Sequence, residues 1–456
     1  MPDRPTNYRD ILFRLRHLTT NIILDVITIP AIAAALALAC PLCAQAIDFD
    51  ALSAPLSAGA EIPPIPEPGR PDAERSPAKE WTVLVYISAR NSLGIEAIKD
   101  VNEMEEAGSG DRVNVVVEMG RIPTAPLYDP FTDTSEPRPM QNDWTGSRRF
   151  LIARDADPLR ITSPVLAYLP DADMGDWNHL AEFITWGKAR FPAKKYLLIV
   201  GGHGSGWRGV KSPAANKGIS YDEVSKNHIA PAELAMAVER GGGVDVYASD
   251  ACLMQTAEFI YELRGSAEFV VGSQESTPGT GYDYARLLNS VSRAPGGARE
   301  TALQVVDAFL ESHSGKSVTI SAVSARRAGE LAELLNAFAR LVLESPPDRR
   351  LYRENKFRLR SFDDEDSRDL YQLMSLYYDR SDTPAVKEQA AAVMRFLTGT
   401  FVAQNGAAGR KSKDANGVSI YFPLSWLSYK ETYGRLSFSA DTAWDDMLKA
   451  VLFEKT

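Results

Sequence analysis

Short apolar segments that alternate with amphipathic ones constrain the fold of this chain more than any other feature. The first, "WTVLVYIS" (81–88), is an almost unbroken apolar run of strand length, and a helical stretch follows at 93–106. Similar runs predict strands at 112–119, 148–154, 194–202, 244–252, 267–274 and 316–324, with helical stretches at 176–192, 230–242 and 253–265. Strands without polar alternation are buried on both faces and are joined by helices. The pattern therefore predicts a three-layer α/β/α sandwich with a mostly parallel central sheet.

The last third of the chain has a different pattern. We assign 81–324 to the core and 325–456 to a helical C-terminal extension of the same unit. Its segments 328–345 and 369–378 are amphipathic, and "NGVSIYFPLS" (416–425) predicts one late strand. The sequence leaves open whether this part packs against the sheet or forms a small appended domain.

The N-terminus has the pattern of an export signal. Arginines precede an apolar run from Val26 to Leu42, and Ala44 and Ala46 stand at the small-residue positions of a cleavage site. This predicts a signal peptide at 1–46 and an exported protein, periplasmic or extracellular. Lipid anchoring at Cys40 is the disfavoured alternative, because Ala37 stands where a larger aliphatic residue is preferred. Residues 47–80, rich in Pro, Ala and Ser, predict a flexible linker.

Charge and hydropathy argue against a nucleic-acid partner and against a membrane-spanning segment in the mature protein. The 456-residue chain has a formal net charge of −10, and loss of 1–46, which holds four Arg and three Asp, would leave −11. Nucleic-acid binding needs a basic surface, so we expect no nucleic-acid partner. No segment after the signal is long and apolar enough for a bilayer, so we expect no membrane span in the mature protein.

Two residues that carry reactive groups follow neighbouring predicted strands. Cleavage after Ala46 would leave Cys252 as the only thiol, unable to form an internal disulfide. It ends one predicted strand, and His203, in "YLLIVGGHGSGW" (196–207), follows another. Because parallel strands deliver their carboxyl ends to one edge of a sheet, we expect the thiol and the imidazole to meet there.

This pair has the chemistry of a cysteine nucleophile with its acid–base partner. We expect Cys252 to begin a helix, whose N-terminus would favour the thiolate. The backbone N–H groups of Gly204 and Cys252 are placed to face a developing oxyanion. The structural alternatives are a buried, inert cysteine and a turn histidine bonded to backbone.

Three segments taken together resemble one family. "GGHGSGW" (201–207), "SDACLMQTAEFIYEL" (249–263) and "VVGSQESTPGTGYDY" (270–284) are similar to those of the clostripain family of caspase-like cysteine peptidases, as is "NGVSIYFP" near the C-terminus. The resemblance implies a caspase-like fold, a His203 and Cys252 dyad, and cleavage after Arg or Lys.

The same resemblance implies that Asp250 lines the pocket for the basic side chain, where a recessed carboxylate can hold a guanidinium through two charge-assisted hydrogen bonds. Helix capping is the alternative role for Asp250. Asp283 is a second candidate carboxylate of the pocket, with a turn role as its alternative.

The loop between the two catalytic segments has the composition of an accessible nick site. Arg208, Lys211 and Lys217 lie there among small and polar residues. The resemblance implies self-cleavage in the 208–217 loop, and Lys217 is the preferred position.

Other chemistries fit less well. The glycine-rich turn lacks the G-x-G-x-x-G spacing of nucleotide sites, and Ser205 lacks a G-x-S-x-G elbow. Without an H-E-x-x-H motif, we expect no metal site and no required cofactor, although the acidic loops leave calcium binding open. His179, His228 and His313 have no partners at ligand spacing and are interpreted as surface or structural residues.

The sequence thus predicts an exported cysteine endopeptidase that acts on protein or peptide substrates. The alternative is a non-catalytic caspase-like module that binds peptides or partners at the cell envelope. Such a module would be expected to lack the histidine or the cysteine, and this chain has both.

Overall fold

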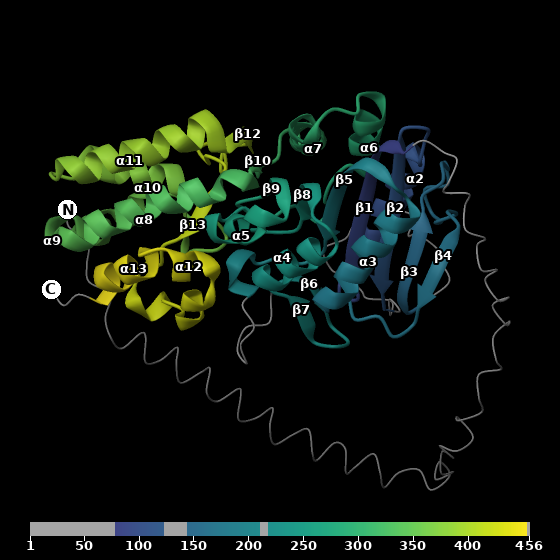
Figure 1. Ribbon diagram of the computed structural model, residues 1–456, viewed down its shortest axis with the longest axis horizontal. Helices are drawn as coiled ribbons and strands as arrows, with labels where there is room; N and C mark the ends of the chain where they lie inside the picture. The colour runs from purple at the N-terminus through teal and green to yellow at the C-terminus, as the bar shows by residue number, and fades with distance from the viewer. Residues whose placement is uncertain (1–77, 123–143, 210–217, 454–456) are drawn as a thin grey trace, which may run out of the picture. The chain divides into compact units, whose positions relative to one another are not determined.

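The central sheet contains nine strands in a computed structural model that describes residues 78–122, 144–209 and 218–453 (Figure 1). Their order is β12-β10-β9-β8-β5-β1-β2-β3-β4. The five central strands β9, β8, β5, β1 and β2 are parallel, and two antiparallel strands extend the sheet at each edge. The strands are β1 (Lys79–Ala89), β2 (Val113–Arg121), β3 (Gly146–Leu151), β4 (Val165–Leu169), β5 (Ala193–Gly201), β8 (Val244–Asp250), β9 (Ala267–Gly272), β10 (Val318–Ser324) and β12 (Val402–Ala408).

Helices cover both faces of this sheet. Alternate residues of β1 belong to different cores, with Leu84 and Tyr86 in one and Val83 and Val85 in the other. The first core includes residues of α3 (Trp177–Arg190), α4 (Pro231–Arg240) and α5 (Ala257–Glu262). The second includes residues of α2 (Gly94–Ala107), α6 (Tyr284–Arg293) and α7 (Ala298–Ser312). The predicted three-layer sandwich with a mostly parallel sheet is confirmed.

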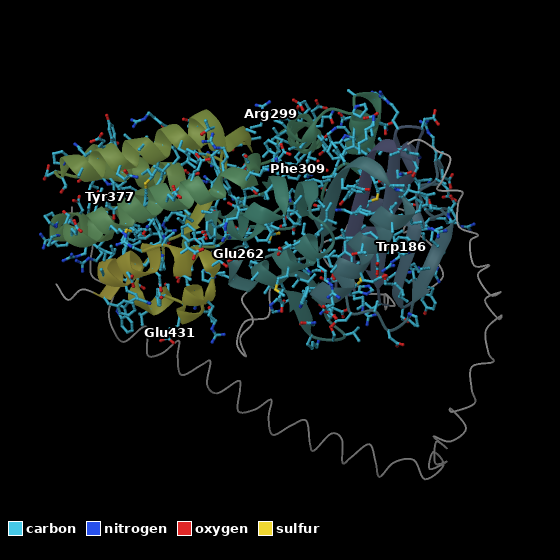
Figure 2. The ribbon with its side chains drawn as sticks, in the orientation of Figure 1. Trp186, Glu262, Arg299, Phe309, Tyr377 and Glu431 are labelled. Carbon is cyan, nitrogen blue, oxygen red and sulfur yellow. The ribbon has the colours of Figure 1, made fainter. Side chains whose placement is uncertain are left out.

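The C-terminal part packs against the sheet and shares its core. Leu373 and Trp444 belong to the same buried cluster as Val270 of β9. Glu262 of α5 accepts hydrogen bonds from the backbone N–H of Ser437 (2.9 Å) and from its hydroxyl (2.8 Å), where the two parts meet in Figure 2. The helices of this part are α8 (Ala328–Glu344), α9 (Pro346–Asn355), α10 (Leu370–Arg380), α11 (Pro384–Phe396), α12 (Ser437–Asp441) and α13 (Trp444–Phe453).

The late strand predicted at 416–425 is confirmed as β13 (Ser419–Tyr421), although it is short and lies outside the main sheet. Strand β13 pairs with β11 (Ser367–Asp369) in a separate two-stranded sheet, and β12 occupies the edge of the main sheet instead. Sequence reasoning missed β12 because an edge strand pairs on one side only, and "VAQNGAA" is largely half-buried and has no apolar run. Strand β4 is half-buried for the same reason, and a short hairpin joins β6 (Ile219–Asp222) to β7 (Asn227–Ile229).

Strand β1 begins at Lys79, two residues before the predicted start of the core at 81, and so includes the end of the predicted linker (47–80). The predicted signal peptide (1–46), residues 47–77 of that linker, Lys211 and Lys217 lie outside the described residues. Among the helices that are described, none has the length and apolar character needed to cross a membrane.

Candidate active site

The ends of β5 and β8 bring the predicted pair together. These strands are parallel neighbours whose last paired residues are Gly201 and Asp250. His203 and Cys252 each lie two residues beyond that pair, and both line one cavity of about 250 Å³. The expectation that the imidazole and the sulfur reach the same edge of the sheet is confirmed.

The two loops are packed directly on one another. A Cβ at Gly204 would lie 2.7 Å from the Cys252 carbonyl oxygen and 2.8 Å from the Ala251 Cβ, so a larger residue would force the loops apart. One turn later, buried Trp207 contacts the ring of Tyr421, with 4.5 Å between centroids. The histidine loop is therefore held between the cysteine loop and the C-terminal part.

Cys252 does not begin a helix, contrary to the prediction. Helix α5 starts at Ala257, and Thr256 is its N-cap, with a side chain that accepts from the Phe259 N–H. Leu253, in the intervening turn, has φ of +64°. The helix dipole is thus too far along the chain to act on the thiol. Instead, the backbone N–H of Thr277 donates to Cys252 Sγ at 3.3 Å, and this loop residue was not identified from the sequence.

The imidazole of His203 is oriented by Ser92, a residue outside the motifs singled out in the sequence. Ser92 Oγ lies 3.1 Å from His203 Nε2, in the loop between β1 and α2. That loop is tied down by a buried ion pair between Arg90 Nε and Asp222 Oδ2 (2.7 Å). Sequence reasoning missed Ser92 because only the fold places it beside a histidine 111 residues away.

The proposed oxyanion donors lie at this junction. Cys252 lines the cavity, and Gly204 directly follows His203, which also lines it. Within the described part of the chain, no hydrogen bond involves the backbone N–H of either residue. Neither N–H group therefore has a hydrogen-bond acceptor among the described residues.

Asp250 lines the same cavity and is 9% exposed. Its Oδ2 accepts hydrogen bonds from the Tyr284 hydroxyl (2.9 Å) and the Tyr282 N–H (3.2 Å). Burial raises the pKa of Asp250, and these two hydrogen bonds oppose the shift. The capping alternative is wrong, because the helix after Cys252 begins seven residues beyond Asp250.

Asp283 is not part of this cavity. It is the N-cap of α6, where its side chain accepts from the Arg286 N–H (2.8 Å) and pairs with Arg286 Nε (3.2 Å). It lines a separate cleft together with residues of α6 and α7. The prediction that Asp283 adds a carboxylate to the substrate pocket is wrong, because helix capping and the pair with Arg286 occupy both of its oxygens.

The additional carboxylates of the cavity come from α2. Glu96 and Asp100, one turn apart, both line it. Burial raises the pKa of Asp100 well above its usual range, and the nearby charges of Asp250, Glu103 and Glu96 raise it further. Sequence reasoning missed these residues because acidic side chains on an amphipathic helix normally mark its solvated face.

The remaining histidines have structural contacts. His179 Nε2 pairs with buried Glu118, His313 Nδ1 lies 2.9 Å from the Phe309 carbonyl oxygen, and His228 is buried. Arg208, at the start of the predicted nick loop, pairs with Asp364 and Asp366. In the ranges that the structure describes, no group of three His, Cys, Asp or Glu side chains is arranged to hold a metal ion.

A family model and a known protein are both similar to this chain in sequence. A family model described as the clostripain family matches residues 85–450. The chain is similar to clostripain from Hathewaya histolytica, with 28% identity over 240 residues that cover 49% of this chain and 44% of that protein. The match therefore spans less than half of that relative's length.

Solved structures share the fold. A secreted C11 cysteine protease from Bacteroides thetaiotaomicron, in complex with an irreversible peptide inhibitor, has a TM-score of 0.58 and 20% identity, covering 80% of this chain and 99% of that one. An inactive zymogen C11 protease from Parabacteroides distasonis gives the same TM-score, identity and coverage. At these identities the likeness shows a common caspase-like α/β architecture.

Proposed function

Because the chain belongs to the clostripain family, we propose that it is a cysteine endopeptidase that hydrolyses peptide bonds after basic residues. One observation carries the proposal: the register of β5 and β8 ends at Gly201 and Asp250, and His203 and Cys252 line the same cavity just beyond. A peptide carbonyl in that cavity would lie within reach of both a nucleophile and a proton carrier.

In the proposed mechanism, Cys252 Sγ bonds to the scissile carbonyl carbon while the thiol proton passes to His203. The backbone N–H groups of Gly204 and Cys252 stabilise the oxyanion of the tetrahedral intermediate. His203 then gives its proton to the leaving amine nitrogen, the C–N bond breaks, and a thioester remains. Water, activated by the neutral imidazole, hydrolyses the thioester and restores the thiol.

Two fixed contacts support these roles. Ser92 holds one ring nitrogen of His203, which limits rotation of the imidazole. The Thr277 N–H donates to Cys252 Sγ and so fixes the position of the sulfur in the cavity. Asp250, recessed in the same cavity, supplies the charge that would hold a cationic side chain next to the scissile bond.

The test is hydrolysis of fluorogenic peptides that end in Arg, Lys or Asp, with and without prior alkylation of the thiol. We expect turnover after Arg and Lys only, abolished by alkylation and by Cys252→Ala. The second candidate is a caspase-like module that binds peptides without cleaving them. If the protein binds peptides ending in Arg or Lys but hydrolyses none of the three kinds of peptide, the result would favour that module.

We propose that no metal or organic cofactor is required, since the nucleophile, the base and the oxyanion donors all come from the chain. Equal activity with a chelator and with added calcium is the expected result. A loss of activity with the chelator, restored by calcium, would establish a calcium requirement.

Export and self-processing complete the proposal. A protein exported through the signal at 1–46 would begin at Ile47, which N-terminal sequencing of the mature protein would detect.

Self-cleavage in the 208–217 loop is the proposed activation step, with Lys217 as our preferred site. A zymogen is described for the Parabacteroides distasonis protease, which supports such a step for this chain. Intact mass should reveal two fragments for the wild type and a single chain for Cys252→Ala, whereas one full-length species in both would refute self-cleavage.

A further inference from the structure

We infer that Asp100 is a second specificity residue, which together with Asp250 makes the cavity select arginine over lysine. The inference rests on the proposed function, because it assigns the substrate side chain of that same site. It goes beyond the single carboxylate implied by family resemblance, since Asp100 lies on α2, 150 residues before Asp250.

The geometry of Asp250 leaves one of its oxygens for a ligand. Tyr284 and Tyr282 donate to Oδ2, and no described group donates to Oδ1. Gly281, with φ of +56°, is packed so closely that a Cβ there would lie 2.6 Å from Oδ2 and 3.0 Å from Oδ1. The carboxylate is therefore fixed by its surroundings, and Oδ1 accepts no hydrogen bond from a described residue.

Helix α2 presents a row of carboxylates to this region. Glu96, Asp100 and Glu103 are four and three residues apart and so share one face of the helix. Glu103 is already engaged, because it accepts a hydrogen bond from the Tyr284 N–H at 3.1 Å. Tyr284 thus links α2 to Asp250 through its two ends, which leaves Glu96 and Asp100 as the half-buried carboxylates of α2 that line the cavity. Of these two, Asp100 is near enough to Asp250 for that charge to raise its pKa.

Like charges at this spacing destabilise a helix, and burial adds to the cost. Burial raises the pKa of Glu103 to about 7, and the pKa values of Asp100 and Asp250 are raised as well. A cation that enters the cavity removes this penalty by pairing with the ionised carboxylates. The arrangement is therefore that of a binding site for a positive group rather than a means of stabilising the empty protein.

Two separate carboxylates favour a guanidinium over an ammonium. Arginine has five N–H donors in a planar fork and can contact both Asp250 Oδ1 and Asp100 at once, whereas lysine is a compact point charge with three donors. Ile87, Leu93 and Ala97 also line the cavity and provide apolar contacts for the aliphatic stem. A single carboxylate would discriminate far less between the two side chains.

The experiment compares kcat/KM for matched peptides ending in Arg and in Lys, using the wild type and Asp100→Asn. We expect the Arg-to-Lys ratio to fall by about tenfold or more in Asp100→Asn. Glu106→Gln is the matched control, because it removes the same charge from an exposed position of the same helix. Its ratio should stay within twofold of the wild type, and an unchanged ratio in Asp100→Asn would overturn the inference.

A binding measurement separates this inference from the proposed function. Calorimetric titration of Cys252→Ala with the Arg and Lys peptides, with and without Asp100→Asn, reports recognition when no bond is cut. A preference for Arg that depends on Asp100 supports the inference even if the wild type proves to be inactive as a peptidase. Equal affinities with and without Asp100→Asn overturn it whatever the kinetic result, and matched melting temperatures confirm that each variant is folded.

Discussion

At the scale of single residues, the site is assembled from side chains whose roles depend on their neighbours. Cys252 would be an unremarkable strand-end thiol without the N–H of Thr277, and His203 a turn histidine without Ser92. Asp250 owes its place to the space left by Gly281. Small polar residues in loops therefore decide how the two reactive groups are presented.

Ser92→Ala tests the orientation of the imidazole. Loss of the contact to His203 Nε2 should lower kcat up to about tenfold, in line with one hydrogen bond of about 0.5–1.5 kcal/mol, and leave KM nearly unchanged. Ser92→Thr keeps the hydroxyl and should retain most of the activity. Equal losses in both variants would indicate that the loop, and not the hydrogen bond, was disturbed.

At the scale of elements, the sequence predicts the strands better than the turns and helix starts beyond them. The apolar runs that became β1, β5, β8 and β9 are buried on both faces, so their sequence reflects their environment directly. The meeting of His203 and Cys252 could be predicted from that pattern alone. The start of α5 could not, because the segment from Leu253 to Gln255 has the apolar character of a helix while Thr256 supplies the cap.

The carboxylates show the other limit of sequence reasoning. Asp283 and Asp100 are both acidic residues near a helix, and only their tertiary contacts distinguish a cap from a pocket residue. The family resemblance indicated Asp250, which lies two residues before Cys252 in the chain. It gave no position for a partner on a helix 150 residues earlier.

A substitution of Asp369 tests the coupling between the C-terminal part and the loop that follows β9, which contains Gln274. This fully buried carboxylate caps α10 through the Gln372 N–H (3.0 Å) and accepts from the Asn416 N–H (2.7 Å) and Gln274 Nε2 (3.2 Å). Asp369→Ala should lower the free energy of unfolding by about 2 kcal/mol or more, since a cap is lost and buried donors are left unpaired.

Asp379→Ala, an exposed site at the other end of α10, is the control for Asp369→Ala and should change the free energy by less than about 0.5 kcal/mol. Urea denaturation of the three proteins provides the comparison. Similar stabilities for both variants would mean that the C-terminal part does not brace the loop through Asp369.

At the scale of the whole molecule, a buried charge network joins the sheet to α3. Glu118 of β2 pairs with Arg149 of β3 (2.7 Å) and with His179 of α3. Burial opposes the charged form of each partner, but mutual attraction and hydrogen bonding dominate. The pKa of His179 is raised and that of Glu118 is lowered.

The network predicts how stability depends on pH. The pKa of His179 is raised in the folded state. Its contribution to the free energy of unfolding is therefore complete below the unfolded-state pKa of about 6.5 and is lost as pH rises through the folded-state pKa. The contribution of Glu118 to the free energy of unfolding is complete above the unfolded-state pKa of about 4.3. It is lost as pH falls through the lowered folded-state pKa. As pH rises above about 6.5, the free energy of unfolding of the wild type should therefore decline more steeply than that of His179→Gln, and equal slopes would contradict this.

In the proposed mechanism, catalysis depends most directly on His203 and Cys252 acting together at the edge of the sheet. The decisive measurement is kcat/KM of His203→Ala, with Cys252 intact, for a peptide ending in Arg. Loss of a general acid and base predicts a decrease of about 10²- to 10⁴-fold with the melting temperature preserved. A folded His203→Ala that retains activity within about tenfold of the wild type would contradict the joint role of the two residues.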